Sequence, residues 1–160
     1  MASALKSLSE YNAETIPSGK GKKIGIVVSE YNSDITFSLL KGCLETLGQH
    51  GVKENHIQLV YVPGAFELTF GARILSKQYK LDAIICLGCV IKGDTDHDKY
   101  INHAVAQGIT NLSLQIDKPV IFGLLTPNNH KQAVDRAGGK HGNKGVEAAV
   151  TALKMMALNQ

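Results

Sequence analysis

The sequence predicts an α/β fold, a three-layer αβα sandwich built on a four-stranded parallel sheet. Two observations support this prediction. Four short apolar runs, rich in β-branched residues, alternate with segments of helical periodicity, and continuous runs of this kind are typical of strands covered on both faces. Parallel strands are joined by right-handed crossovers, which place helices on both faces of the sheet. One such domain is expected for 160 residues.

The predicted strands follow a polar arm. Residues 1–21 are expected to form this arm, and residues 22–160 are expected to form a single domain. We expect the strands at residues 23–29, 57–62, 81–87 and 119–125, because each run is apolar and is bounded by turn residues. The third strand is expected to end where Gly88 begins a turn.

Helices are expected between the strands, each starting beside a residue that can cap its first turn. They are expected after a cap at Ser33 or Asp34, over residues 65–79, over residues 97–114, and between a cap at Asn128 or Asn129 and Gly138. A glycine-rich loop then leads to a last amphipathic helix, whose apolar face consists of Val146, Ala149, Val150, Leu153 and Met156.

The composition excludes several classes of protein. The net charge is only +3 and the basic residues are scattered, so we expect no nucleic-acid partner. No apolar run reaches the ~18 residues of a membrane span, so we expect no membrane partner. The cysteines number three, and the first residues lack the apolar core of a signal peptide. We therefore expect a cytoplasmic protein without a disulfide framework.

The unusual segments of the sequence follow the predicted strands, and parallel sheets bind ligands beyond the carboxyl ends of their strands. These segments are Tyr31-Asn32 and residues 63–67, 88–97 and 126–129. Residues 88–97 (GCVIKGDTDH) turn through glycines, whose amides suit an anion, and reach His97 where a helix begins. The neighbouring carboxylates are expected to raise the pKa of His97, which suits proton transfer near neutral pH. A plain helix-start histidine is the commoner alternative.

Other candidate residues have both a functional and a structural interpretation. Tyr31 either stacks on a flat ring or covers the helix behind it. Glu67 either accepts hydrogen bonds from a ligand hydroxyl or caps its helix. Arg136 and Lys144 flank the glycine-rich loop, and here the sequence slightly favours solvated charges at helix ends.

Residues 88–98 partly match two known motifs, a phosphate-binding loop and a calcium-binding loop, but each match fails at a required position. Residues 88–95 read GxxxxGDT, with Asp94 at the position where the nucleotide-binding loop needs a lysine. Residues 94–98 start like a calcium loop, but Lys99 replaces its glycine and Val105 its glutamate. The sequence therefore predicts neither an NTPase nor a calcium site.

Redox and metal chemistry are not expected either. Cys86 and Cys89 form a CxxC pattern, but Cys86 lies in a predicted strand, which indicates buried thiols. The remaining histidines have no metal-ligand spacing. We expect no metal and no other cofactor.

Five segments occur in an order and spacing that are specific when taken together. They are VPGAFE (residues 62–67), LGCVIKGDTDH (87–97), PVIFG (119–123), RAG (136–138) and GNKG (142–145). From residue 23 to the carboxyl terminus, the chain thereby resembles the 6,7-dimethyl-8-ribityllumazine synthase family. The resemblance implies a flavodoxin-like strand order.

The resemblance also implies an activity. It is the condensation of 5-amino-6-(D-ribitylamino)uracil with 3,4-dihydroxy-2-butanone 4-phosphate, the penultimate step of riboflavin biosynthesis. In this family the ring amine attacks the ketone, phosphate leaves the resulting imine, and a second condensation closes the ring, without a metal or a covalent enzyme intermediate. Oriented proximity of two bound reactants can supply roughly 7–11 kcal/mol. The alternative is a lumazine- or flavin-binding or shell-forming protein of the same fold with little turnover.

The resemblance assigns roles to single residues. His97 matches a proton-transfer residue, and Arg136 matches a phosphate-pairing arginine. The matched substrate contacts are Tyr31 and Asn32 at the pyrimidine and the ribityl side, Ala65, Phe66 and Glu67 along the ribityl chain, Val90 and Ile91 at the pyrimidine, Gly93, Asp94 and Thr95 around the phosphate, and Phe122 and Lys144 from a neighbouring subunit. Lys92, in the same turn, stands where arginine is common, Tyr31 where Phe or Trp is common, and Asp96 where Thr or Pro is common.

The resemblance finally implies a homo-oligomer. The family forms pentamers with active sites between subunits, and some members assemble twelve pentamers into a shell. Residues 136–145 lack the insertion of the members that remain pentameric, so a sixty-subunit particle, with an associated riboflavin synthase, is permitted. The arm of residues 1–21 would then add a strand to the sheet of a neighbouring subunit.

Overall fold

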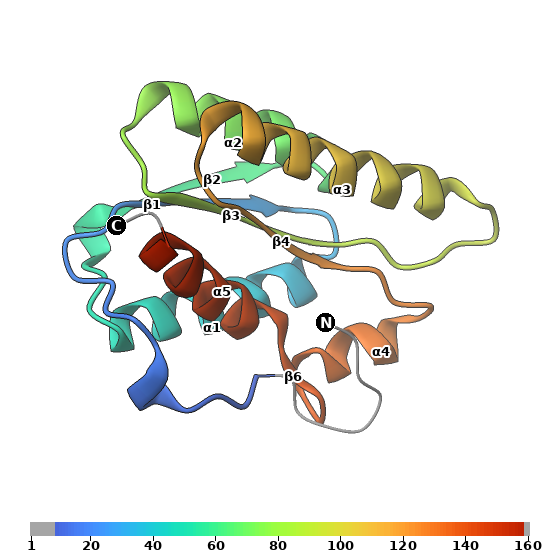
Figure 1. Cartoon of the computed structure of the whole chain (residues 1–160). Coiled ribbons are helices and arrows are strands. Elements are labelled where there is room, and N and C mark those ends of the chain that lie inside the picture. Colours follow the sequence, from blue (N-terminus) through green and yellow to red (C-terminus); the bar gives the residue numbers. More distant parts are fainter. Residues whose placement is uncertain (1–8, 159–160) are drawn as a thin grey trace.

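The computed structural model describes residues 9–158 and has the predicted layered architecture (Figure 1). The main sheet has the order β2-β1-β3-β4, and all three of its strand pairs are parallel. Its strands are β1 (Ile24–Ser29), β2 (Ile57–Val62), β3 (Ala83–Cys89) and β4 (Val120–Leu125). The predicted fold class and the flavodoxin-like strand order are therefore confirmed.

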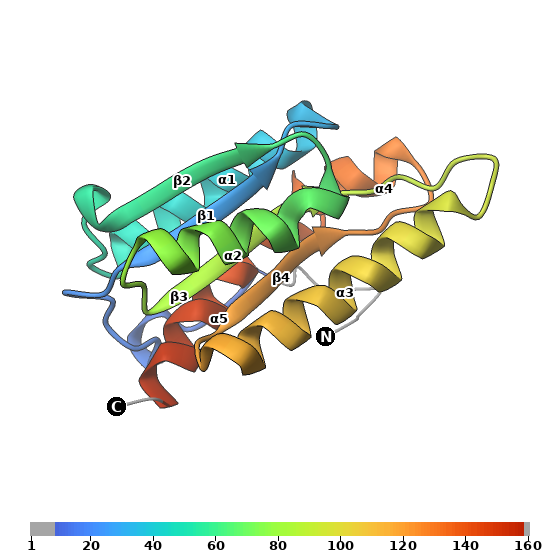
Figure 2. The same cartoon turned by 90° about the horizontal axis from the view of Figure 1, so that it is seen from above.

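Two pairs of helices cover the sheet. Helices α2 (Leu68–Gln78) and α3 (His97–Ile116) lie on one face, and α1 (Ser33–Gln49) and α5 (Lys144–Leu158) lie on the other (Figures 1 and 2). A short helix, α4 (His130–Asp135), follows β4 at the edge where the strands end. Among residues 9–158 there are also three single-turn 3₁₀ helices, at Ala13–Thr15, Glu54–His56 and Ala65–Glu67.

The core consists of two hydrophobic clusters separated by the sheet. Successive side chains of a strand point to opposite faces, so Ile26 and Val28 of β1 pack toward α1 and α5, whereas Val27 packs toward α2 and α3. Every residue of β1 and of β3 is buried. This explains why the two central strands have uninterrupted apolar sequences, as the prediction assumed.

The third strand was expected two residues too early. It runs Ala83–Cys89 and includes Gly88, which pairs with Leu124 instead of starting a turn. A Cβ atom on Gly88 would lie 2.8 Å from a Leu124 methyl carbon and 2.9 Å from one of Leu68. The glycine is thus needed for close packing within the strand, and the turn begins only after Cys89.

The glycine-rich loop is also different from the expectation. The short helix ends at Asp135, and the next residues form an antiparallel hairpin of β5 (Ala137–Gly139) and β6 (Gly142–Asn143). Gly138 and Gly142 have φ angles of 109° and 86°, which residues with a Cβ atom rarely adopt. Asn129 caps α4 as expected, since its side chain accepts from the Gln132 N–H group.

The first helix starts from an unexpected residue. Its N-cap is Asn32, one residue before the predicted Ser33 or Asp34, and Asn32 has a left-handed backbone with φ 58°. The left-handed region is costly for most residues and is tolerated best by asparagine after glycine. A local pattern of capping residues cannot reveal such a backbone.

The described part of the predicted arm packs on its own chain. Ile16 is 8% exposed and belongs to the core cluster of α1 and α5, and the Tyr11 hydroxyl lies 3.3 Å from His50 Nε2. Residues 1–8 of the arm lie outside the described residues. Within residues 9–158, no helix is both long enough and apolar enough to cross a membrane.

Candidate active site

A hollow of about 410 Å³ lies at the carboxyl edge of the sheet. Segments that follow β1, β2 and β3 line it, as expected for a parallel sheet. Its lining includes the predicted residues Tyr31, Asn32, Ala65, Phe66, Glu67, Val90, Ile91, Gly93, Thr95 and His97. Residues from three distant parts of the sequence therefore meet in one place, where the sequence expected a ligand.

Tyr31 and Asn32 form the wall after β1. The Tyr31 side chain is 74% exposed, so a face of its ring is free to stack on a flat ligand. Asn32 instead turns toward the sheet, where its Nδ2 donates a hydrogen bond of 2.9 Å to the Cys89 carbonyl. This bond joins the end of β1 to the end of β3, and within residues 9–158 the Oδ1 atom of the amide receives no hydrogen bond.

The segment after β2 begins with a short 3₁₀ turn. Glu67 Oε2 accepts a hydrogen bond of 3.1 Å from the Gly64 N–H group, so the capping interpretation of Glu67 is present in the structure. Its carboxylate still lines the hollow, beside the 61% exposed ring of Phe66. A carboxylate can accept several hydrogen bonds, and the cap therefore leaves capacity for ligand hydroxyl groups.

The segment after β3 is held at its start and open at its turn. Val90 N–H donates to the Leu125 carbonyl and Lys92 N–H donates to the Pro127 carbonyl, each over 2.9 Å. Beyond this point, no acceptor in residues 9–158 receives the backbone N–H groups of Gly93, Asp94 or Thr95. Free amides in a turn are a favourable environment for an anion.

His97 is the first residue of α3 and is one of the residues that line the hollow. Its backbone N–H donates to Thr95 Oγ1 over 3.4 Å, which holds the turn against the helix start. One neighbouring carboxylate, that of Asp96, is paired with Lys99 at 2.9 Å. His97 therefore lies next to the open amides, at the start of a helix whose dipole also favours negative charge.

Several predicted residues do not line this hollow. Phe122 lies partly exposed on the edge strand β4, and Lys92 and Asp94 are exposed on the turn. Arg136 and Lys144 lie at the two ends of the β5–β6 hairpin. A single chain thus brings together the residues expected at the pyrimidine and the ribityl chain, but not the cations expected at the phosphate.

Arg136 and Lys144 are not the solvated charges that the sequence favoured. Both side chains are 20% exposed, and Glu147 lies between them at 11%. Lys144 Nζ donates to Glu147 Oε2 over 3.2 Å, and Arg136 Nη1 lies 2.9 Å from Glu147 Oε1. That arginine nitrogen donates to the His141 carbonyl instead, and Glu147 Oε1 receives no hydrogen bond from residues 9–158.

The sequence interpretation missed Glu147 and part of the hollow. Glu147 is three residues after Lys144, which is the spacing of helical ion pairs. Asp98 and Ile101 also line the hollow. They follow His97 on the first turns of α3, so the helical period could have indicated them.

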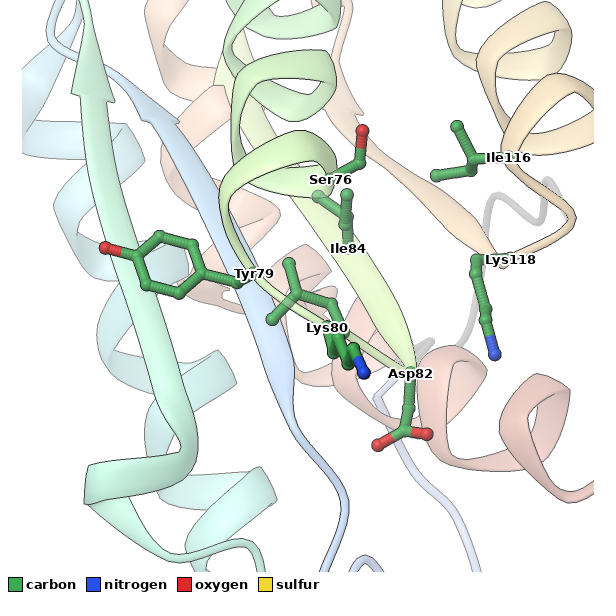
Figure 3. Close-up of a pocket in the computed structure, with 8 residues that line it drawn as sticks. Ser76, Tyr79, Lys80, Asp82, Ile84, Ile116 and Lys118 are labelled. Carbon is green, nitrogen blue, oxygen red and sulfur yellow. The ribbon is translucent and has the colours of Figure 1, made fainter.

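A second hollow, also of about 410 Å³, lies at the opposite edge of the sheet (Figure 3). It is lined by Ser76, Tyr79, Lys80, Leu81, Asp82, Ile84, Ile116 and Lys118. Its Asp82 carboxylate already accepts a backbone hydrogen bond of 2.8 Å from Lys23. None of the predicted site residues lies there, so the hollow at the carboxyl edge is the candidate active site.

An ion pair near the site has a shifted titration. His130 Nε2 lies 2.6 Å from Asp34 Oδ2, joining the starts of α4 and α1. The hydrogen bond from His130 lowers the pKa of Asp34 below its ordinary value of 3.8. Both side chains are about 60% exposed, so the pair orients the two helix starts more than it stabilises the fold.

The three cysteines are expected to be unreactive in the folded protein. Cys43, Cys86 and Cys89 are free and buried, and burial raises the pKa of each thiol from 9.0 to about 12. We predict no reaction with an aromatic disulfide reagent at pH 8 in native protein, and complete reaction in denaturant. Rapid labelling of native protein at pH 8 would contradict the prediction that the thiols are unreactive.

The free energy of unfolding is expected to fall as the pH rises from 9.0 to about 12, because over that range the thiols ionise only in the unfolded chain.

Comparisons with known proteins agree with the geometry. The family model described as 6,7-dimethyl-8-ribityllumazine synthase matches residues 21–160. The chain is 52% identical over 160 residues to the 6,7-dimethyl-8-ribityllumazine synthase of Porphyromonas gingivalis, covering 100% of this chain and 99% of that one. It is 54% identical over 156 residues to the protein of that name from Parabacteroides distasonis, covering 98% of each. It is also 54% identical over 157 residues to the protein of that name from Cytophaga hutchinsonii, again covering 98% of each chain.

Proposed function

The chain belongs to the 6,7-dimethyl-8-ribityllumazine synthase family, and on that premise we propose that it condenses 5-amino-6-(D-ribitylamino)uracil with 3,4-dihydroxy-2-butanone 4-phosphate. The products are 6,7-dimethyl-8-ribityllumazine, inorganic phosphate and water. One observation carries the proposal. The residues that resemble the family's substrate contacts come from three strand ends and line one hollow of about 410 Å³.

The two ends of the hollow suit the two substrates. The flat pyrimidine lies against the exposed ring of Tyr31 and the backbone of Val90 and Ile91, and its ribityl hydroxyls extend toward Glu67 and the Oδ1 atom of Asn32. The phosphate of the second substrate lies on the open amides of residues 93–95. Both substrates are then held side by side, and their oriented proximity supplies most of the catalysis.

His97 moves protons in this scheme. The ring amine attacks the ketone, water leaves as the imine forms, phosphate is eliminated, and a second condensation closes the ring. Each step transfers a proton to or from the reacting groups. His97 lines the hollow next to Thr95 and the phosphate turn, so its imidazole reaches those groups as an acid or a base.

A neighbouring copy of the chain completes the site. Phe122, Arg136 and Lys144 do not line the hollow of their own chain, and Arg136 and Lys144 share Glu147 as a single unit. The exposed turn of residues 92–95 lacks a cation beyond Lys92 to balance a phosphate dianion. We therefore assign the hairpin cations and Phe122 of one copy to the hollow of the next, within a pentamer.

Larger assembly is part of the proposal. The edge strand β2 exposes Leu59 and Tyr61, and an unpaired apolar edge accepts an added strand. The arm of another copy is its proposed partner, within a particle of up to sixty subunits that can associate with riboflavin synthase. The three free thiols support a reducing compartment, which we take to be the cytoplasm.

The condensation assay tests the activity. Purified protein with both substrates is expected to produce the lumazine chromophore faster than the uncatalysed reaction. We predict that His97→Ala lowers kcat about a hundredfold, at the lower end of the roughly 10²–10⁴-fold that general acid–base catalysis contributes, because proximity of the two substrates remains. Complete loss of activity, with intact substrate binding and assembly, would contradict the proximity-dominated mechanism. Tight riboflavin binding without any condensation would favour a binding protein instead.

The mass of the particle tests the assembly. Light scattering of the active protein is expected to give a pentamer or a multiple of five chains. A stable monomer with full condensation activity would refute the shared site, because Arg136 and Lys144 could then not reach the hollow from another copy.

A further inference from the structure

Side-chain hydrogen bonds attach the β5–β6 hairpin to α1, and the proposed reaction gives these side chains no role. Ser38 Oγ donates a hydrogen bond of 2.6 Å to the Ala137 carbonyl. Asn143 Nδ2 donates one of 3.0 Å to the Ser38 carbonyl. Both strands of the hairpin are therefore attached to the same residue of α1, although they are about a hundred residues away in the sequence.

The side-chain amide of Asn143 forms hydrogen bonds through both its nitrogen and its oxygen. Its Oδ1 accepts from the Gly145 N–H group over 2.8 Å, which fixes the start of α5. Its own backbone N–H donates to Ser9 Oγ over 2.6 Å. A side chain in this position must offer a donor and an acceptor at once, and asparagine does so in one flat amide.

The surroundings of Asn143 are shaped to hold it. A Cβ atom on Gly42 of α1 would lie 2.7 Å to 2.9 Å from the three terminal atoms of the Asn143 amide. Because Gly42 has no side chain, the Asn143 amide can lie directly against α1 at this position. Packing and hydrogen bonds together confine the side chain to one orientation.

Asn143 lies between the two cations of the hairpin. Lys144 follows it directly, and the Lys144 N–H group donates to the Arg136 carbonyl over 2.9 Å. Ala137, next to Arg136, pairs with Asn143 across the two strands. A change in the position of Asn143 therefore moves the backbone of Arg136 and of Lys144 together.

We propose that Asn143 is a positioning residue, which holds Arg136 and Lys144 in the place where they bind the phosphate of the second substrate. The inference rests on the proposed function, because it takes the phosphate role of Arg136 as given. Asn143 itself contacts no reacting group. It sets the geometry of two cations whose hydrogen bonds to phosphate depend on direction.

The test compares Asn143→Ala and Asn143→Asp with the wild-type enzyme, each as the assembled particle. Asn143→Asp keeps the acceptor for Gly145, but it replaces the donor to Ser38 with a second oxygen and adds a negative charge beside Lys144. For both variants we expect KM for 3,4-dihydroxy-2-butanone 4-phosphate to rise at least about fivefold, the factor for one lost hydrogen bond, because Asn143→Ala loses two bonds and Asn143→Asp places two oxygens against each other at Ser38. Inhibition by inorganic phosphate is expected to weaken by the same factor, while KM for the pyrimidine changes less than about twofold.

Thr110→Val is the control. Thr110 lies on α3, on the other face of the sheet, and donates from Oγ1 to the Ala106 carbonyl over 2.9 Å. The variant loses a threonine hydrogen bond within a helix, away from the hairpin, and should leave both KM values unchanged. Ser38→Ala, which removes only the bond to Ala137, replaces Asn143→Ala if that variant does not assemble, and should raise the same KM.

The outcomes are distinct. A rise of the phosphate KM in Arg136→Ala but not in the Asn143 variants would overturn the positioning role. Equal changes of both KM values, or a fall of kcat alone, would also overturn it and indicate a general structural role. If Arg136→Ala itself leaves the phosphate KM unchanged, then the proposed phosphate role of the hairpin is what fails.

Discussion

Gly145→Ala is expected to lower the free energy of unfolding by about 3 kcal/mol, near the upper end of overpacking effects. A Cβ atom on Gly145 would lie 1.8 Å from the Leu39 carbonyl oxygen and 2.6 Å from its carbonyl carbon. These atoms belong to the backbone of α1, and no side-chain rotation can move them away. Helices α1 and α5 would have to separate at this point. The measurement is the urea midpoint at one fixed protein concentration, since assembly adds to stability.

Gly48→Ala is the control for this prediction. Gly48 lies in α1, the helix that Gly145 of α5 contacts, and an added Cβ atom on Gly48 meets nothing within 4 Å. Alanine is the better helix former, so stability should rise by about 0.5 kcal/mol. If Gly145→Ala and Gly48→Ala have equal midpoints, the close contact between α1 and α5 is not a rigid feature of the folded protein.

Arg136→Ala is expected to have the largest effect on the reaction. We predict that KM for 3,4-dihydroxy-2-butanone 4-phosphate rises about thirtyfold, because hydrogen bonds to a charged group contribute roughly 1.5–3 kcal/mol. KM for the pyrimidine should change much less, since we propose that this substrate binds at the other end of the hollow. Steady-state rates with each substrate varied in turn give both values. An equal rise of the two KM values would argue against a phosphate contact.

Two further variants separate charge from geometry at this residue. Arg136→Lys keeps the charge but loses the planar fork that grips a phosphate through two nitrogens. Its effect should lie between those of the wild type and Arg136→Ala. Lys140→Ala removes a cation at the tip of the same hairpin, where the side chain is 65% exposed and 3.9 Å from Asp135. It should leave the phosphate KM unchanged.

The sequence predicted that the candidate site residues meet at one edge of the sheet because their signals are local. Each apolar run predicts a strand from its own composition, and in a parallel sheet all strand ends reach one edge. Tyr31, Glu67 and His97 follow three different runs, so their meeting at one hollow could be inferred without any knowledge of side-chain contacts. The prediction of β3 was wrong by two residues because Gly88 was interpreted as a turn residue. In the structure, Gly88 lies inside the strand, where close packing leaves no room for a Cβ atom.

The sequence by itself determined the order of strands and helices, the layers that they form, and the edge at which the candidate site residues meet, because hydrophobic periodicity and turn residues act over short stretches of chain. Only the tertiary structure decided how the cations are arranged. Glu147 joins Arg136 to Lys144, and Asn143 reaches Ser38 across 105 positions. Such contacts depend on how α1 packs against α5. Gly42 lets the Asn143 side chain approach α1, and Gly145 lets the backbone of α5 approach that of α1. No local pattern in the sequence encodes the distance between two helices.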